Sequence, residues 1–127
     1  GTLAILEDSE RKPIGLCTIN PSSKIVARML DRDPNARVDE SWFADRISRA
    51  LALRNRLFDA PYYRLVHAEA DGLPGVIIDR FGDTCVLQPN AAWAERSLED
   101  LTAALIMQTD IVNVLKTPAG GHARVKV

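Results

Sequence analysis

The sequence has no long hydrophobic run, no strong charge of either sign and little cysteine. No apolar run approaches the roughly 18 residues that a membrane-spanning helix needs. The formal net charge is −1, so no overall field draws the chain to nucleic acid or to a membrane, and such binding requires local patches. Residues 1–12 lack a basic segment followed by an apolar segment and a cleavage site, and a cytoplasmic location is therefore the expectation.

The two cysteines, Cys17 and Cys85, lie far apart in the sequence, each within an apolar segment. There is no CxxC pair and no cluster of Cys and His, so we expect no metal site. The flanking residues of both cysteines favour β-strands. Buried, reduced thiols are the interpretation that this pattern favours, and a disulfide or a reactive thiol is the alternative.

Motifs for catalysis are also missing. No GxSxG is present, and the pair Gly120-Gly121 lacks the lysine and the spacing of a phosphate-binding loop. His67 follows an apolar pair in an extended segment, which favours a structural histidine over a metal ligand or base. His122 follows the two glycines and is expected in an exposed loop. The residues by themselves predict neither a catalytic site nor a cofactor site.

What is present indicates a globular α+β chain. Of the 127 residues, 46% are hydrophobic and 26% are charged, as in ordinary soluble domains. Apolar, β-branched segments between turn residues predict strands, and apolar residues at helical spacing predict helices. Strands are expected at 3–7, 14–20, 24–30, 75–79, 84–88, 110–116 and 122–127, an extended segment at 62–69, and helices at 39–58 and 91–107. The second half therefore reads as a small β-β-α-β-β unit.

Residues 67–83, HAEADGLPGVIIDRFGD, place four acids around a Leu-Pro-Gly turn. Such acids could form a metal site or an acid/base pair, but the alternating acids and distal glutamate of a calcium loop are absent. The structural interpretation is favoured: glycine and proline shape a hairpin and its approach, and Glu69 and Asp71 bind backbone amides of the preceding loop. The residues of this structural motif are Glu69, Asp71, Gly72, Pro74, Gly75, Asp79, Arg80, Gly82 and Asp83.

Basic residues gather on two of the expected elements. Lys24 and Arg28 lie on one expected strand, and Arg46 and Arg49 lie on the expected helix 39–58 with two further arginines. Solvated faces commonly carry such patterns. The alternative is a local patch that contacts RNA phosphates, which need clustered Lys and Arg more than a high overall charge.

The stretch YRLVHAEADGLPGVIIDRFGDTCVLQ resembles a segment of the S-adenosylmethionine (SAM)-dependent large-subunit rRNA cytosine-C5 methyltransferases that carry an N-terminal PUA domain. The stretch GLCTINPSSKIVARMLD is similar to the end of that PUA domain, and DESWFADRISRALALRNRLF to the helix that follows it. The resemblance covers about residues 3–105. It implies a partial PUA-like β segment at 1–38, a linker helix at 39–62 and a central β-β-α-β-β module at 63–127.

The resemblance implies a role for the chain in docking and positioning rRNA, and from the basic patches we expect Lys24, Arg28, Arg46 and Arg49 to be its phosphate contacts. Methyl transfer from SAM to a base would belong to a C-terminal domain that this sequence lacks, so we expect no catalytic residue and no cofactor in the chain itself. The acids then match the family's structural hairpin. Cys17 and Cys85 match neither the cofactor loop nor the catalytic cysteine.

The sequence departs from the family pattern in two places. The start of the PUA domain is missing, and the sequence after about Met107 no longer follows the family. Strand-like segments at both ends predict a fragment of a longer protein. Incomplete sheets leave unpaired edges, and the rival hypothesis is therefore a truncated module that associates with itself and binds no RNA.

Overall fold

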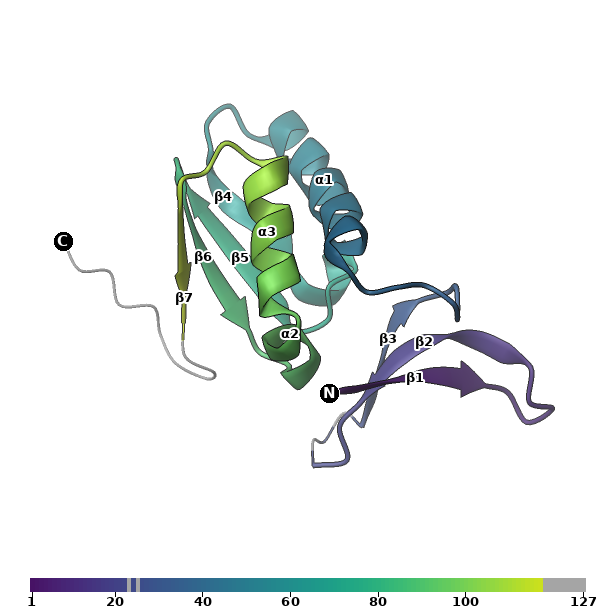
Figure 1. Cartoon of the computed structure of the whole chain (residues 1–127). Coiled ribbons are helices and arrows are strands. Elements are labelled where there is room, and N and C mark those ends of the chain that lie inside the picture. The colour runs from purple at the N-terminus through teal and green to yellow at the C-terminus, as the bar shows by residue number, and fades with distance from the viewer. Residues whose placement is uncertain (23, 25, 118–127) are drawn as a thin grey trace.

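The computed structural model describes residues 1–22, 24 and 26–117, which form two β-sheets and three α-helices (Figure 1). The first sheet is antiparallel in the order β1-β2-β3, with strands Thr2–Glu7, Pro13–Ile19 and Ala27–Asp31. All three predicted strands of this region are confirmed, but the third begins at Ala27. Lys24 therefore precedes the strand that carries Arg28.

The second sheet has the strand order β4-β5-β6-β7, with bounds Tyr62–His67, Val76–Phe81, Thr84–Pro89 and Asn113–Lys116. The first three strands are antiparallel, and the predicted hairpin turns at Gly82, whose φ is +66°. β7 pairs parallel to β6. A parallel pair needs a long crossover, which α2 (Ala92–Arg96) and α3 (Leu98–Gln108) supply.

The order of elements differs from the expected β-β-α-β-β unit by one strand. The extended segment at 62–69 is a full strand, β4, followed by a 3-10 turn, η1 (Ala68–Asp71). The strand expected from residue 110 begins only at Asn113, because the N–H groups of Val112 and Asn113 donate to Asp83 O at 2.7 and 3.2 Å and hold this approach as a loop. The strand expected at 122–127 lies outside the described residues.

Helix α1 (Glu40–Leu57) confirms the prediction for residues 39–58. The Asp39 side chain caps it by accepting from the Trp42 N–H at 3.0 Å, as acidic residues at helix starts commonly do. Its buried face consists of Trp42, Phe43, Ile47 and Ala50, and it packs beside α3 on one face of the second sheet (Figure 1). α1 therefore joins the two sheets in sequence and also supplies core to the second one. The division at residues 38 and 62 stays a prediction.

The helix predicted over 91–107 is in fact two helices that meet at Ser97. Trp93 of α2 is held by its indole N–H, which donates to Pro74 O at 2.8 Å, while α3 aligns with α1. The break changes which residues face the core. Leu101 and Leu105 are fully buried, whereas Ile106 is half exposed, because it lies about 100° around the helix from Leu105.

An aromatic cluster forms where α1 meets α2. The rings of Phe43 and Trp93 stack with centroids 5.8 Å apart, and Trp42 meets both edge-on. Burying one such side chain contributes about 1.5–3 kcal/mol. This cluster therefore fastens α2 to the start of α1. Within the described ranges, no helix is long and apolar enough to cross a membrane.

Candidate functional site

The acid with the most contacts in the 67–83 segment is Asp71, at the end of η1. Its carboxylate accepts two hydrogen bonds from the Arg54 guanidinium, at 3.0 and 2.8 Å, and one from the His67 N–H at 2.7 Å. Arg54 also donates Nε to Arg64 O at 3.0 Å. The side chains of Asp71 and Arg54 are only 8% and 12% exposed. This bidentate pair ties α1 to the loop and occupies both carboxylate oxygens.

Arg46, one of the predicted phosphate contacts, lies in the joint between the two sheets. It donates Nε to Gly72 O at 3.0 Å and Nη2 to Leu30 O at 2.8 Å, and Asp31 lies 3.4 Å from Nη2. The guanidinium carbon is 3.7 Å from the centroid of a ring of Trp42. With a side chain only 11% exposed, Arg46 links β3, α1 and the loop.

The other predicted phosphate contacts lie nearer the surface. Arg28 on β3 pairs with Glu69. Arg49 on α1 pairs with Asp45 at 2.8 Å, and both of these side chains are about two-thirds exposed. Lys24 is exposed ahead of β3. The structure thus brings Arg28 and Arg49 near η1, and Arg49 lines a surface hollow there with residues 70–72. Both guanidinium groups are already paired with carboxylates, those of Glu69 and Asp45.

Glu69 therefore contacts a side chain from another element. The expectation that it binds a backbone amide is wrong for this residue, because the β3 strand brings Arg28 within reach of its carboxylate. The corresponding expectation for Asp71 is confirmed by its bond from the His67 N–H.

The remaining residues of the motif shape the β5–β6 hairpin and its approach. Asp79 on β5 pairs with Arg64 at 2.8 Å. Arg80 is 7% exposed, donates to Gly82 O at 3.0 Å and to the Tyr63 hydroxyl at 3.2 Å, and pairs with Asp110. The glycines at 72, 75 and 82 have φ of +74°, +77° and +66°. Residues other than glycine rarely adopt this region.

Both cysteines are buried and unpaired with each other, which confirms the interpretation as reduced thiols. Burial raises the pKa of Cys85 to about 11, so its thiolate is disfavoured at neutral pH. Among the described residues, no three His, Cys, Asp or Glu side chains gather in a way that could hold a metal ion. Arg46 and Arg54 hold the 68–72 loop between the two sheets. The carboxylates of Glu69 and Asp71 already accept hydrogen bonds from arginines.

The sequence interpretation missed the role of Arg54. Arg46, Ala50 and Arg54 follow one another at intervals of four residues, which places them along one ridge of α1. The small Ala50 between the two arginines lets this ridge approach the 68–72 loop. That spacing was the available signal, but nothing local to the helix indicates which acid each arginine meets.

Curated proteins similar to this chain are rRNA methyltransferases. The ribosomal RNA large subunit methyltransferase I of Cronobacter sakazakii is 40% identical over 101 residues, 77% of this chain and 26% of that protein. Proteins of the same name from Aliivibrio fischeri and Pseudoalteromonas translucida are 42% identical over 90 residues and 35% over 109 residues, 68% and 84% of this chain and 23% and 28% of theirs. The chain thus spans about a quarter of the length of these relatives. No protein-family model matches it.

Two solved structures share the fold. One is a proposed SAM-dependent methyltransferase from Streptococcus mutans, with a TM-score of 0.75 and 17% identity over 84% of this chain and 29% of that one. The other is a proposed methyltransferase complexed with SAH, with a TM-score of 0.76 and 16% identity over the same shares. Most of this chain is therefore similar to a segment that makes up about a quarter of each large-subunit rRNA methyltransferase I. Its fold matches part of two methyltransferase structures.

Proposed function

We propose that this chain is the RNA-docking part of a SAM-dependent rRNA methyltransferase of the family with a PUA domain. The whole protein transfers a methyl group from SAM to a base of large-subunit rRNA, cytosine C5 in this proposal. The observation that carries it is the 35–42% identity to rRNA large subunit methyltransferases I, of which the chain spans about a quarter. The rest of such a protein would hold the cofactor and the reacting base.

A docking role agrees with the chemistry of the groups in the chain. Cys85 is fully buried with a raised pKa, and Cys17 is 2% exposed, so neither thiol is suited to attack a base. Asp71 already accepts hydrogen bonds from Arg54 and His67. The Asp71–Arg54 pair serves to hold the 68–72 loop against α1, and the proposed task of that region is to position RNA.

Within this role, the four predicted basic residues divide into two kinds. Lys24, Arg28 and Arg49 contact phosphates, since Lys24 is exposed ahead of β3 and Arg28 and Arg49 lie at or near the surface around η1. The ion pair of Arg49 with Asp45 is exposed. Such a pair is worth only about 0.3–0.5 kcal/mol, so a phosphate can replace Asp45 at little cost. Arg46 acts as a positioning residue: its bonds to Leu30 O and Gly72 O set β3, and with it Arg28, beside the loop.

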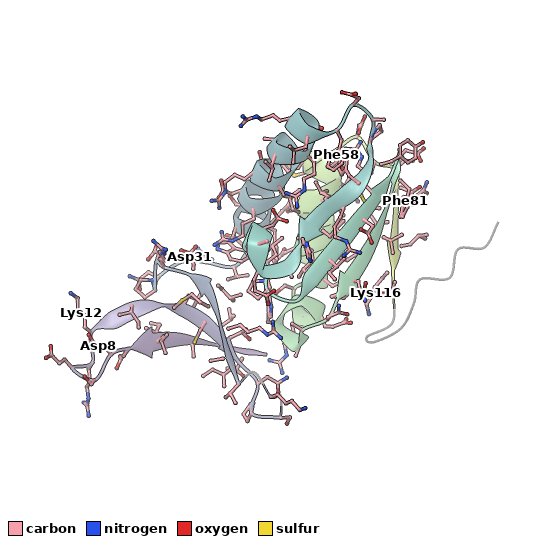
Figure 2. All side chains as sticks on the ribbon, turned by 180° about the vertical axis from the view of Figure 1, so that it is seen from behind. Asp8, Lys12, Asp31, Phe58, Phe81 and Lys116 are labelled. Carbon is pink, nitrogen blue, oxygen red and sulfur yellow. The ribbon has the colours of Figure 1, made fainter. Side chains whose placement is uncertain are left out.

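The test is a titration of the chain with a labelled large-subunit rRNA fragment at low and moderate salt. Phosphate contacts release counterions, so each contact that is lost lowers the salt slope by about one. The double variant Arg28→Gln with Arg49→Gln should bind RNA about tenfold more weakly at low salt and with a slope lower by about two. The matched control is Lys12→Gln with Arg96→Gln, which removes the same charge elsewhere; Lys12 lies at the far hairpin of the first sheet (Figure 2).

Equal losses in the two double variants would contradict the docking surface, and a wild-type chain that retains no RNA at low salt would contradict RNA docking altogether. Calorimetry with SAM accompanies the titration. Heat of binding from SAM would place a cofactor site in this part of the protein. That result would contradict the proposal that this chain docks RNA while the rest of the protein holds the cofactor.

One observation favours a second candidate, a module that associates with itself. The first sheet and the turn before β3 expose large apolar side chains by 37–51%: Leu3, Ile5, Leu6, Ile14, Val26 and Met29. Exposed apolar surface that gathers on one element is typical of an interaction site. A dimer through this sheet would be insensitive to salt. Sedimentation of the RNA samples separates the two candidates, because a concentration-dependent dimer without RNA retention favours self-association.

A further inference from the structure

A surface hollow of about 390 Å³ lies where α1 and α3 both end, near the top of the second sheet in Figure 1. The residues that line it include Asn55, Phe58, Asp59, Tyr63, Arg80 and Asp110. Its volume corresponds to about thirteen water molecules at roughly 30 Å³ each. The hollow therefore has room for a planar ring system, which is more than a single ion needs.

A chain of hydrogen bonds crosses the hollow from Arg80, whose side chain is only 8% exposed. Arg80 Nη1 donates to the Tyr63 hydroxyl at 3.2 Å, and this hydroxyl donates to the side-chain oxygen of Asn55 at 3.5 Å. On the other side, Arg80 Nη2 donates to Asp110 Oδ1. The chain leaves the NH₂ group of Asn55 as a donor at one end and Oδ2 of Asp110 as an acceptor at the other.

The charges around the hollow disfavour an anion. α1 ends at Leu57 and α3 at Gln108, so the carbonyl ends of both helices border the hollow, and helix C-termini carry partial negative charge. The carboxylates of Asp59 and Asp110 add two negative charges, against one positive charge on Arg80. A phosphate would be repelled, whereas a neutral ring with N–H donors and an acceptor meets a partner for each.

Phe58 supplies an aromatic wall that is held in place. It caps α1, where its N–H donates to Arg54 O at 2.9 Å, and its ring lies against that of Tyr63 with the centroids 5.6 Å apart. The turn that follows is fixed as well, because Pro61 O accepts from the Gly82 N–H at 2.8 Å. Phe58 is still 48% exposed. Bases of single-stranded RNA stack on aromatic rings presented in this way.

A cation for a neighbouring phosphate lies beside the hollow rather than in it. Arg56 is exposed in the last turn of α1, next to Asn55 in the sequence. Arg49, a proposed phosphate contact, precedes Asn55 by six residues, or about 9 Å along the helix axis. A short single-stranded segment of RNA can therefore reach the basic surface and the hollow together.

We propose that this hollow holds one unpaired base of the docked RNA, a base that carries an exocyclic amino group. The base stacks on Phe58, and its amino group donates to Asp59 and Asp110. A ring nitrogen or carbonyl oxygen of the base accepts from the NH₂ group of Asn55. Uracil fits less well, because it has no amino group and its carbonyl oxygens would face carboxylates, which are acceptors only. This inference rests on the proposed RNA-docking function and deepens it by naming the part of the RNA that is read.

The first test uses free nucleosides, which carry no phosphate and so bind independently of the basic surface. Cytidine and uridine are titrated separately against the amide NMR signals of residues 55, 59 and 110. We expect cytidine to shift these signals and uridine to bind about tenfold more weakly. Arginine amide, a cation that the carboxylates can also hold, is the third probe. Equal binding of the two nucleosides, or shifts with arginine amide alone, would overturn the base site.

The second test uses two variants, each with a matched control. Phe58→Leu removes the stacking ring. Its control, Phe81→Leu, removes a ring that is 54% exposed near the same end of the second sheet but outside the hollow (Figure 2). Asp59→Asn removes one carboxylate, and its control, Asp83→Asn, makes the same change in the exposed turn between β5 and β6.

For Phe58→Leu we expect affinity for cytidine and for the rRNA fragment to fall about tenfold, since one stacked base is lost. For Asp59→Asn we expect the preference for cytidine over uridine to fall several-fold, because the amino group loses a charged acceptor. Both controls should match the wild type. Asp59 is exposed, so its variant keeps the test decisive even if Phe58→Leu unfolds.

The outcomes separate this site from the docking function. A variant that binds like its control overturns the base site. An rRNA affinity that falls in the Arg28/Arg49 double variant but not in Phe58→Leu leaves docking intact and overturns the site for RNA. Cytidine binding that depends on Phe58 and Asp59, in a chain that retains no rRNA, overturns the assignment to RNA together with docking and identifies a site for free nucleosides.

Discussion

At the scale of single residues, the ion pair between Asp71 and Arg54 shows how a charged group can serve the fold. Both side chains are nearly buried, and the carboxylate accepts from the guanidinium and from a backbone N–H. Removing one partner of a buried pair leaves the other charged and without its counterion. That loss is far larger than the loss of an exposed pair.

Asp71→Ala should therefore lower the free energy of unfolding by about 3–5 kcal/mol, measured by urea denaturation followed by fluorescence. The control is Asp79→Ala, which removes a carboxylate paired with the more exposed Arg64. That variant should lose only about 0–1 kcal/mol. Similar losses in the two variants would show that the Asp71 pair is not a distinct anchor of the loop.

At the scale of elements, the turn before β5 is clamped by the segment that leads into α2. The Val76 N–H donates to Leu73 O at 3.0 Å, and Gly75 O accepts from the Asn90 N–H at 2.8 Å. A Cβ added at Gly75 would lie 2.8 Å from the Cβ of Ala91, whereas one at Gly82 would meet only the end of the Tyr62 side chain at 3.3 Å. The two turns thus share positive φ but differ in how tightly they are packed.

Gly75→Ala should destabilise the chain more than Gly82→Ala. Both substitutions place an L residue in the left-handed region at about 1–2 kcal/mol, and Gly75→Ala adds an overpacking cost of about 1–3 kcal/mol against Ala91. Thermal unfolding of the two variants measures the difference. Equal shifts of Tm would mean that the 73–76 turn can move away from the segment before α2 without loss.

At the scale of the whole molecule, Asp31 connects the two units. It lies at the end of β3 nearest α1 (Figure 2), where its carboxylate accepts from the Trp42 indole at 2.9 Å and lies near Arg46. Burial by itself raises the pKa of Asp31. The bonds from the Asp33 N–H and Trp42, with the charge and bonding of Arg46, outweigh it and hold the pKa below its ordinary value of 3.8.

A pKa that is lower in the folded chain stabilises the fold above the ordinary value, and this contribution is lost as the pH falls through the folded pKa. We therefore expect thermal stability to decrease below about pH 4, to a smaller degree in Asp31→Asn and to an intermediate degree in Trp42→Phe, which keeps a ring but loses the donor. Asp31→Asn should also be less stable than the wild type at pH 7. Parallel pH profiles of wild type and Asp31→Asn would contradict this account of the joint.

The sequence predicted the elements well wherever a local signal decides them. Apolar, β-branched segments between turn residues identified β1, β2, β5 and β6, and apolar residues at helical spacing identified α1. Local signals did not reveal the break at Ser97, because it depends on the anchoring of Trp93 by Pro74 O across the molecule. They also did not reveal that β7 pairs parallel to β6, since strand direction within a sheet follows from the crossover and not from the strand's own residues.

By itself, then, the sequence determined the α+β class, the hairpin at Gly82, the buried thiols and the resemblance to rRNA methyltransferases. Only the tertiary structure decided which charges are available for a partner. Arg46 and Arg49 are three residues apart on one helix, yet one is buried in a joint and the other is exposed. The reason is physical: helical spacing orients an arginine, but its partners, here Asp31, Leu30 and Gly72, come from other segments that meet it only in the folded chain.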